Sequence, residues 1–407
     1  MTTQLPEVFN GPDAWVSADL ASNTDAWLKI LSTREVVELE EAAHTYIKTG
    51  RDVGEISCDD FVIPEFGKHL QTLKAKLLKG AGIEVIRGLP VSGYTQELAA
   101  CIFCGIGAHL GSARSQNTQG HILGHVRDAG LSSTDPNARI YQTAERQSFH
   151  TDSADVVGLL CLEKAQSGGE SMLVSALSIY NAYKQRRPDL LPLLFEPIAT
   201  DRRGEVPEGA DPYMTIPVLS WYEGYLTVFY QRQYIESAQR FVDAPHLSAR
   251  HIEALDLFDE LANDPSLYFS MQLEPGDMQF VYNHSQLHDR TGFIDSPDPA
   301  RRRHLLRLWL SIAGDRPLPP SFVQRYGSVE AGSRGGIVTA KPDYMRRSIS
   351  CGGLSFGCLN IRLMSFDKNP GDTTAFGRSS ASAPLGCKLE IVIQIGNNQF
   401  ENYSKLE

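Results

Sequence analysis

The sequence has few of the features that mark membrane, secreted or nucleic-acid-binding proteins. No apolar run reaches the length that spans a bilayer, and the first residues show neither the basic nor the apolar region of a signal peptide. The longest block of basic residues is the triplet Arg301-Arg302-Arg303, and the net charge is −11. A surface that follows nucleic-acid phosphates needs the opposite charge. We therefore expect neither a nucleic-acid nor a membrane partner.

Cysteine is also scarce, with seven residues in a chain of 407. This odd number does not indicate a disulfide framework. Cys101 and Cys104 form a C-x-x-C motif, but they lie in an apolar segment without a second cysteine pair, so we interpret them as core thiols rather than a zinc or redox site. A reducing, cytoplasmic location follows. Rossmann and P-loop glycine patterns and internal repeats are absent too.

The composition, with 42% hydrophobic and 21% charged residues, is typical of a globular protein. Residues 1–31 are predicted to form an irregular N-terminal arm anchored by Trp15 and Trp27, within a single domain that covers residues 1–337. Residues 338–407 form a Ser/Gly-rich tail to which the sequence assigns no structure. A homo-oligomer remains possible.

The domain alternates strand-like runs with a few helical ones. Ser32 and Glu35 form a capping box that predicts a helix immediately after them. Residues 111–138 are polar and glycine-rich and are expected to form loops or a lid near a site. The β-branched and Leu-rich runs that predict strands are residues 83–88, 139–142, 156–162, 171–174, 216–230, 267–273, 278–283 and 303–312. This pattern favours a mixed α+β fold in which a β-sandwich or barrel is supported by flanking helices.

His150 and Asp152 are the first candidates for chemistry. Residues two apart on a strand point to the same face, so this H-x-D motif would place an imidazole beside a carboxylate. A distant His would complete a triad of two His and one carboxylate, which suits non-haem Fe(II) oxygenases. An isolated H-x-D motif is more often an ordinary surface or capping feature. The third ligand would be His284 or His288, which follow the strand predicted at residues 278–283.

His121 and His125 are four residues apart and could share a helix face. They have no accompanying carboxylate at a recognisable metal-site spacing, so we do not expect them to be ligands.

Arg303 and Arg307 are four residues apart on a Leu-rich predicted strand and would therefore share a face. An Fe(II) oxygenase of this kind needs a co-substrate that chelates iron, such as 2-oxoglutarate, whose far carboxylate requires a cation in a dry pocket. The planar guanidinium of Arg supplies a bidentate pair there, and a hydroxyl such as that of Ser171 would complete it. A salt bridge is the alternative role for either Arg.

Taken together, four segments resemble the taurine dioxygenase/TfdA-type family of Fe(II)- and 2-oxoglutarate-dependent oxygenases. The resemblance covers roughly residues 10 to 337, and it implies a double-stranded β-helix, or jelly-roll, core. The four segments are Phe149-His150-Thr151-Asp152, Gly168-Gly169-Glu170-Ser171, Leu287-His288-Asp289-Arg290-Thr291 and Arg303-His304-Leu305-Leu306-Arg307.

The resemblance also implies a role for individual residues. His150, Asp152 and His288 would be the iron ligands, with His288 preferred to His284 because the Arg-Thr that follows it matches the family. Arg303 would pair with the 2-oxoglutarate carboxylate, and Ser171 stands where the family often has Thr. Arg307 would contact 2-oxoglutarate or an anionic substrate.

The implied activity is oxidation of a C–H bond in a small, anionic or amino-acid-like substrate, by hydroxylation, desaturation or cyclisation. O₂ would be consumed, and succinate and CO₂ released. Substrate contacts are expected from Arg307, Arg232 and the group Tyr222, Tyr225 and Tyr230, although hairpin packing is an alternative role for the tyrosines. Two other functions remain open, a metal-dependent hydrolase on the same triad and a non-catalytic jelly-roll binding protein.

Overall fold

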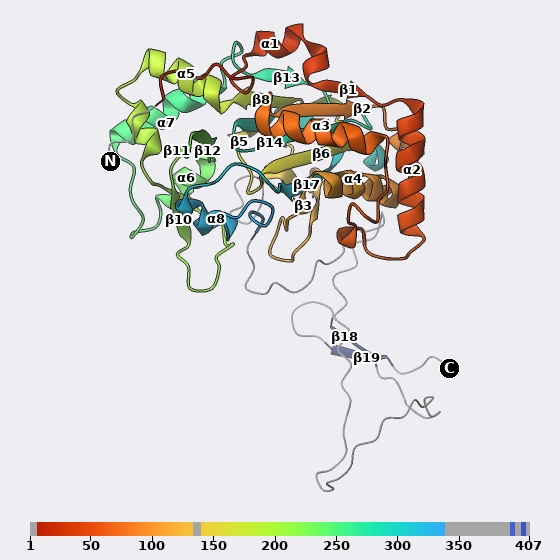
Figure 1. Ribbon diagram of the computed structural model, residues 1–407. Helices are drawn as coiled ribbons and strands as arrows, with labels where there is room; N and C mark the ends of the chain where they lie inside the picture. The colour runs from red at the N-terminus through yellow and green to blue at the C-terminus, as the bar shows by residue number, and fades with distance from the viewer. Residues whose placement is uncertain (1–5, 133–139, 338–390, 395–399, 404–407) are drawn as a thin grey trace, which may run out of the picture. The chain divides into compact units, whose positions relative to one another are not determined.

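The computed structural model describes residues 6–132, 140–337, 391–394 and 400–403 (Figure 1). The chain divides into two compact units, Met1–Ile349 and Ser350–Glu407. In the second unit, β18 (Ile391–Gln394) pairs antiparallel with β19 (Phe400–Tyr403), and the rest of the predicted 338–407 tail lies outside the described residues. The domain boundary at residue 337 therefore stays a prediction.

Two sheets form the centre of the first unit, and every pair of strands in them is antiparallel except β1–β2. The larger sheet runs in the order β1 (Leu28–Ile30), β2 (Ile83–Arg87), β14 (Met278–Tyr282), β6 (Val156–Glu163), β17 (His304–Ser311) and β3 (Ser112–Ala113), with β4 (Leu123–Val126) also paired to β17. The smaller sheet runs in the order β13 (Phe269–Met271), β8 (Ser171–Ser175), β15 (Gln286–Arg290) and β5 (Gln147–His150).

Alternation along the strands of the larger sheet explains why the two sheets pack face to face. On β17, Leu306 and Leu308 belong to a core cluster shared with helices, whereas Leu305 belongs to a separate cluster. That second cluster includes Leu173 and Phe269 of the smaller sheet. Because successive side chains of a strand point to opposite faces, one face of the larger sheet meets helices and the other meets the smaller sheet. This is the predicted jelly-roll core with flanking helices.

Three helices cover the outer face of the larger sheet, namely α2 (Thr33–Ile47), α3 (Phe66–Lys79) and α4 (Gln96–Leu110) (Figure 1). The capping box predicted before α2 is confirmed: the Glu35 amide donates to Ser32 Oγ at 3.3 Å, and the Ser32 amide donates to the Glu35 carboxylate at 2.7 Å. Cys101 and Cys104 are buried free thiols in α4, as predicted.

The remaining elements surround the smaller sheet. Helices α5 (Ala176–Arg186) and α7 (Ala249–Ala262) share a core cluster with the hairpin of β11 (Leu219–Tyr222) and β12 (Tyr225–Val228). A second hairpin pairs β9 (Ile198–Asp201) with β10 (Tyr213–Ile216). The shorter elements are α1 (Ser17–Ser22), β7 (Ser167–Gly168), α6 (Arg232–Ala238), β16 (Phe293–Ile294) and α8 (Val323–Tyr326). No helix in the described part of the chain is long and apolar enough to cross a membrane.

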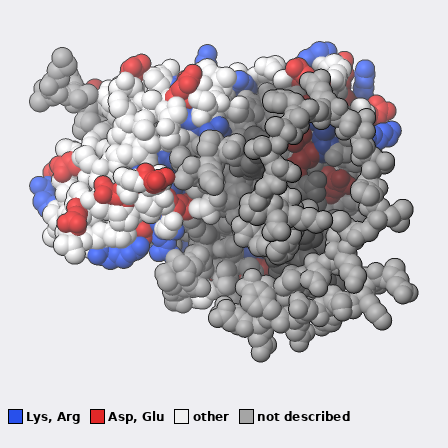
Figure 2. Space-filling model, turned by 90° about the horizontal axis from the view of Figure 1, so that it is seen from below, with Lys and Arg blue, Asp and Glu red and all other residues white. Residues whose placement is uncertain are grey.

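The N-terminal arm is not irregular as predicted, because it contains α1 and β1, but its tryptophans anchor it as predicted, with Trp27 packed on Phe269 at 5.1 Å between ring centroids. The indole N–H of Trp15 donates to Ala81 O at 2.9 Å, and that of Trp27 donates to Leu20 O at 3.0 Å. The face of the molecule in Figure 2 carries interspersed acidic and basic side chains on its visible described surface.

Two local predictions were wrong. Ile140–Gln142 is a 3-10 turn rather than a strand, because the amide and hydroxyl of Thr143 both bond back to the Ile140 carbonyl. The predicted loop region 111–138 contains β3 and β4, whose pairing with β17 decides their conformation.

Candidate active site

His150 and His288 face each other across the smaller sheet, where they are register partners on β5 and β15. Their ring centroids lie 4.2 Å apart. Asp152 is two residues after His150 in the chain. One ligand atom from each of the three side chains lies within 4.8 Å of the other two. The fold therefore brings together the three residues that the sequence predicted as a metal site.

The hydrogen bonds of His150 define which ring nitrogen can bind a metal. Its Nδ1 lies 2.8 Å from the carbonyl oxygen of Ser148, which can only accept, so Nδ1 carries the proton. Its Nε2 accepts a hydrogen bond from the side-chain amide of Gln147 at 2.8 Å. The lone pair of Nε2 is therefore accessible to a ligand. Burial, and to a smaller extent the neighbouring His288, lowers the pKa of His150 to about 3. The imidazole is therefore neutral at physiological pH.

Asp152 lies beyond the end of β5, not on the strand as the H-x-D argument assumed. The Asn283 side chain fixes this turn by accepting from the Asp152 amide at 2.8 Å and donating to the Asp152 carbonyl at 2.5 Å. Asp152 Oδ2 accepts from Trp309 Nε1 at 2.8 Å and lies 3.3 Å from Arg307 Nη1. Burial raises the pKa of Asp152, but Arg307 and the two histidines outweigh it and hold the carboxylate ionised.

His288 contributes an imidazole ring that makes no side-chain hydrogen bond to the described residues. Its Nε2 lies 3.6 Å from Asp152 Oδ2, which is too long for a hydrogen bond, and its buried Nδ1 has no partner among the described residues. Two imidazole nitrogens and one carboxylate oxygen match the donor set of non-haem Fe(II) sites that keep positions open for other ligands. The residues present therefore fit a bound Fe(II).

A small cavity of about 40 Å³ is lined by His150 and His288 of the triad. Arg303 lines it and is only 6% exposed, and no described carboxylate lies within 4.0 Å of its guanidinium. Arg303 Nη1 has no hydrogen-bond partner in the described structure. Burial lowers the pKa of Arg303 to about 10, which still leaves it charged at neutral pH. Ser171 also lines the cavity and donates to Gln279 at 3.0 Å. A ligand with a carboxylate could supply the anion that this buried guanidinium lacks.

Arg307 lies between this cavity and a larger one, since it lines both. Its guanidinium lies 4.8 Å from the ring centroids of Tyr141 and Trp309, and Nε donates to Gln116 at 2.7 Å. Together with the contact to Asp152, these interactions fix the side chain in one position at the centre of the site.

The larger cavity has a volume of about 450 Å³ and reaches Asp152 and Trp309. Arg203 lines this cavity, and its buried Nε has no hydrogen-bond partner among the described residues. No described carboxylate lies within 4.0 Å of its guanidinium. Arg203 has a φ of 52°, a left-handed conformation that is unfavourable for a residue with a side chain and is frequent at functional sites. Arg325 also lines the cavity, donates to Ser153 and lies 3.5 Å from Glu205.

The structure does not support Arg232 as a substrate contact. Arg232 forms ion pairs with Glu236 at 2.8 Å, Asp256 at 2.7 Å and Asp259 at 3.1 Å, so its guanidinium is already compensated. Neither it nor any of the three predicted tyrosines lines the larger cavity. Tyr230, for example, donates instead to Asp259 of α7 at 2.6 Å.

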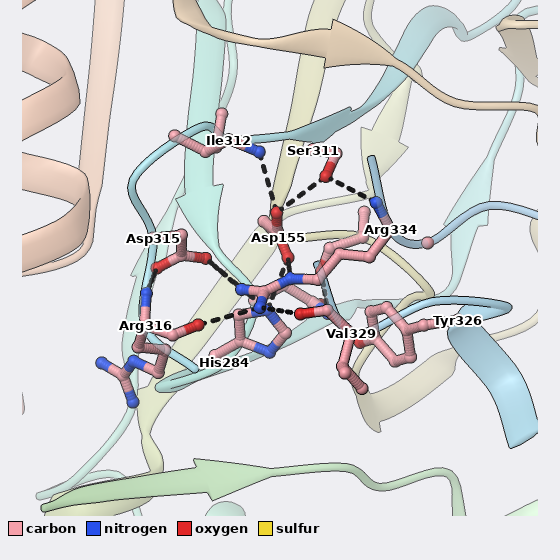
Figure 3. A network of polar contacts seen from close by, with 12 residues as sticks. Asp155, His284, Ser311, Ile312, Asp315, Arg316, Tyr326, Val329 and Arg334 are labelled. Atoms are coloured by element: carbon pink, nitrogen blue, oxygen red, sulfur yellow. Dashed lines mark hydrogen bonds and ion pairs between the residues drawn. The ribbon is translucent and has the colours of Figure 1, made fainter. Parts of the chain in front are cut away.

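His284 belongs to a different polar cluster, shown in Figure 3. Its Nε2 lies 2.8 Å from Asp155 Oδ1 and 3.8 Å from Asp315 Oδ2. Arg334 supplies the positive charge there, with 2.7 Å from Nε to Asp155 and 2.8 Å from Nη2 to Asp315. The guanidinium therefore places a positive charge beside both carboxylates, where a metal could otherwise bind. This leaves His288 as the His that faces His150.

His121 and His125 do not form a common site either. His121 Nδ1 lies 3.0 Å from Asn117 Nδ2, whereas His125 Nδ1 lies 2.8 Å from His304 Nε2. Among the described residues, neither His121 nor His125 belongs to a cluster of side chains able to hold a metal.

Two residues beside His288 were not identified as functional from the sequence. Asp289 is buried, and its Oδ2 accepts hydrogen bonds from Arg146 Nε at 3.0 Å and Nη2 at 2.5 Å, which ties β15 to the residues before β5. Arg290 lines the small cavity with Arg303. The sequence contained a signal for Arg290, because residues 288 and 290 are two apart on a strand and point to the same side.

Comparison with known proteins places this site in a family. The family model "Taurine catabolism dioxygenase TauD, TfdA family" matches residues 47–309. The chain is 31% identical over 332 residues to FR-33289 synthase of Streptomyces rubellomurinus, covering 80% of this chain and 97% of that protein. It is also 31% identical over 315 residues to the taurine hydroxylase-like protein SAT17 of Stachybotrys chartarum, covering 75% of this chain and 80% of that protein.

The fold is similar to that of a solved asparagine oxygenase in complex with Fe(II), 2S,3S-3-hydroxyasparagine and succinate. The TM-score is 0.55 at 16% identity, and the match covers 70% of this chain and 93% of that chain.

Proposed function

The chain belongs to the TauD/TfdA family and is an Fe(II)- and 2-oxoglutarate-dependent dioxygenase of small substrates, and we propose that His150, Asp152 and His288 hold its iron. The observation that supports this assignment is the approach of their ligand atoms to within 4.8 Å of one another. The proton on His150 Nδ1 leaves Nε2 free to ligate, and the Trp309 indole orients Asp152.

Arg303 and Ser171 would bind the 2-oxoglutarate carboxylate that is remote from the metal. Both line the small cavity beside the triad, and the Arg303 guanidinium lacks a described carboxylate partner. Arg307 borders both cavities, so it would separate the co-substrate from the substrate while holding Asp152 in place.

Bound iron and 2-oxoglutarate supply the chemistry, in which O₂ converts 2-oxoglutarate to succinate and CO₂ and one C–H bond of the substrate is hydroxylated. The residues of this chain position the reactants and exclude water. Asp152 stays ionised and His150 stays neutral, so neither group has to lose a proton when the metal binds. The small cavity is lined mainly by buried side chains, which would limit the contact of the co-substrate with solvent.

The substrate would be a small molecule with an anionic group, bound in the 450 Å³ cavity. Arg203 supports this class, because it lines that cavity without a described carboxylate partner. A relative named as taurine hydroxylase-like also points to a substrate with an oxyanion. Taurine, which carries a sulfonate, is therefore the first compound to test.

The assignment of the metal site is tested by anaerobic titration of the apo protein with Fe(II) and 2-oxoglutarate, followed by absorption spectroscopy. We expect a visible charge-transfer band that is lost in His150→Ala. His121→Ala is the matched control, since His121 contacts Asn117 outside the triad, and it should keep the band. A folded His150→Ala protein that retains the full band would contradict the assignment.

The other expectations from the sequence stay proposals. A cytoplasmic location is supported by the four cysteines in the described segments, Cys58, Cys101, Cys104 and Cys161, which are all free thiols. The absence of a nucleic-acid partner and a homo-oligomeric state remain predictions. The unpaired Arg303 favours the dioxygenase over the hydrolase alternative, because a hydrolase on the same triad has no use for a buried cation in this cavity.

A further inference from the structure

Arg290 lines the small cavity that we propose for 2-oxoglutarate, but the ligands proposed so far give it no role. It lies two residues after His288 on β15, so both side chains point to the same side of the smaller sheet. Its register partner on β8 is Ser171. Side chains of register partners on antiparallel strands are direct neighbours on one face. Arg290, Ser171 and Arg303 all line the small cavity.

Arg290 and Arg303 are both buried as cations, with 7% and 6% of their surfaces exposed. Each guanidinium lies over the ring of Phe293, at 4.7 Å for Arg290 and 5.2 Å for Arg303. Within the described residues, neither has a carboxylate inside ion-pair distance, and three of their donors have no partner: Nε and Nη1 of Arg290 and Nη1 of Arg303. Two buried like charges with unused donors are strongly unfavourable unless an anion joins them.

Another buried Arg shows that such an arrangement is not general in this protein. Arg202 is also only 6% exposed and also lacks a carboxylate partner. However, it donates to the carbonyl oxygens of Asp211, Tyr213 and Gln324, and none of its buried donors is unpaired. Arg290 makes only two such contacts, through Nη2 to Thr143 O at 3.2 Å and to Ile140 O at 3.5 Å.

We propose that Arg290 and Arg303 together bind the far carboxylate of 2-oxoglutarate, which makes Arg290 a second residue that selects the co-substrate. The inference rests on the proposed assignment of the small cavity to 2-oxoglutarate. Two guanidiniums match the two oxygens of one carboxylate and their lone pairs. The cavity therefore discriminates against 2-oxo acids that have an uncharged end, because these would leave both cations buried without an anion.

Binding of 2-oxoglutarate and of 2-oxovalerate distinguishes this role from a structural one. The two compounds have the same five-carbon chain, but 2-oxovalerate ends in a methyl group instead of the far carboxylate. Isothermal titration calorimetry on the Fe(II)-loaded protein, without oxygen, measures both affinities without turnover. We expect Arg290→Met to weaken 2-oxoglutarate binding at least tenfold and to change 2-oxovalerate binding less than twofold. Arg290→Lys, which keeps the charge but not the planar geometry, should retain part of the affinity.

Arg202→Met is the matched control for the loss of a buried Arg, and it should change neither affinity. Equal weakening of both ligands by Arg290→Met would overturn the proposal, because it would show general damage to the cavity. Unchanged 2-oxoglutarate affinity would overturn it as well. Failure of the underlying cavity assignment has a different result, since Arg303→Met would then also leave 2-oxoglutarate binding intact.

Discussion

The cluster around Arg334 allows a quantitative prediction about stability (Figure 3). Arg334 is fully buried and forms ion pairs with both Asp155 and Asp315. It also donates to the carbonyl oxygens of Arg316 at 2.8 Å and Val329 at 3.2 Å. Arg334→Met removes the charge and these donors while keeping most of the side-chain volume. Two carboxylates then remain buried beside His284 without their main cation.

Removing one partner of a buried ion pair costs roughly 3–5 kcal/mol, and the two carbonyl groups left without donors favour the upper end of this range. At about 2.1 cal/mol/K per residue, unfolding a unit of more than 300 residues has an entropy of roughly 0.7 kcal/mol/K, so the melting temperature should fall by about 4–7 °C. Differential scanning calorimetry measures this shift. Arg250→Met is the control, because the ion pair of Arg250 with Asp189 is exposed and should contribute less than about 1 kcal/mol.

The loss should also depend on pH. Burial raises the pKa of Asp155, but His284 and Arg334 outweigh it, so in the native protein this pKa lies below its usual 3.8. Without Arg334, we expect burial to outweigh the remaining contact with His284, so that the folded-state pKa of Asp155 rises above that of the unfolded chain. Such a group destabilises the folded state increasingly as pH rises, so Arg334→Met should lose less stability at pH 5 than at pH 8. A loss below about 1 kcal/mol at pH 8 would refute the reasoning that Arg334 compensates this cluster.

Two further predictions concern the larger cavity and the thiols. Arg203→Gln should raise KM for an oxyanion-bearing substrate by about tenfold or more while leaving KM for 2-oxoglutarate unchanged, because Arg203 lines only the larger cavity; steady-state kinetics would contradict this if both constants rose together. In native protein at pH 8, iodoacetamide should label exposed Cys58 and spare Cys101 and Cys161, since burial raises the pKa of each buried thiol to about 12. Peptide mass spectrometry measures the labelling, and equal modification of all three cysteines would contradict the structure.

Local sequence was sufficient wherever neighbouring residues decide the conformation. The Ser32 capping box places the start of α2, because donor and acceptor are only three residues apart. The Leu-rich run at residues 303–312 predicts a strand, and β17 forms there with leucines buried on both of its faces. The family motifs directed attention to His150, Asp152 and His288, and the fold brings these residues together.

The sequence could not establish features that depend on which segments meet in space. The H-x-D spacing suggested a strand through Asp152, but the strand ends at His150 and a side chain 131 residues away, Asn283, holds the turn. Arg232 was a plausible substrate contact until three carboxylates from α6 and α7 were found around it.

The choice between His284 and His288 shows the same division. Both follow one strand within five residues, and only the family motif separated them in the sequence. In the fold, β15 pairs with β5 and places His288 opposite His150, whereas His284 precedes β15 and contacts Asp155, which also pairs with Arg334. The sequence alone therefore determined which residues could serve as metal ligands or as cations. Which charges are compensated and which await a ligand was decided by tertiary structure, because burial and pairing depend on segments far apart in the chain.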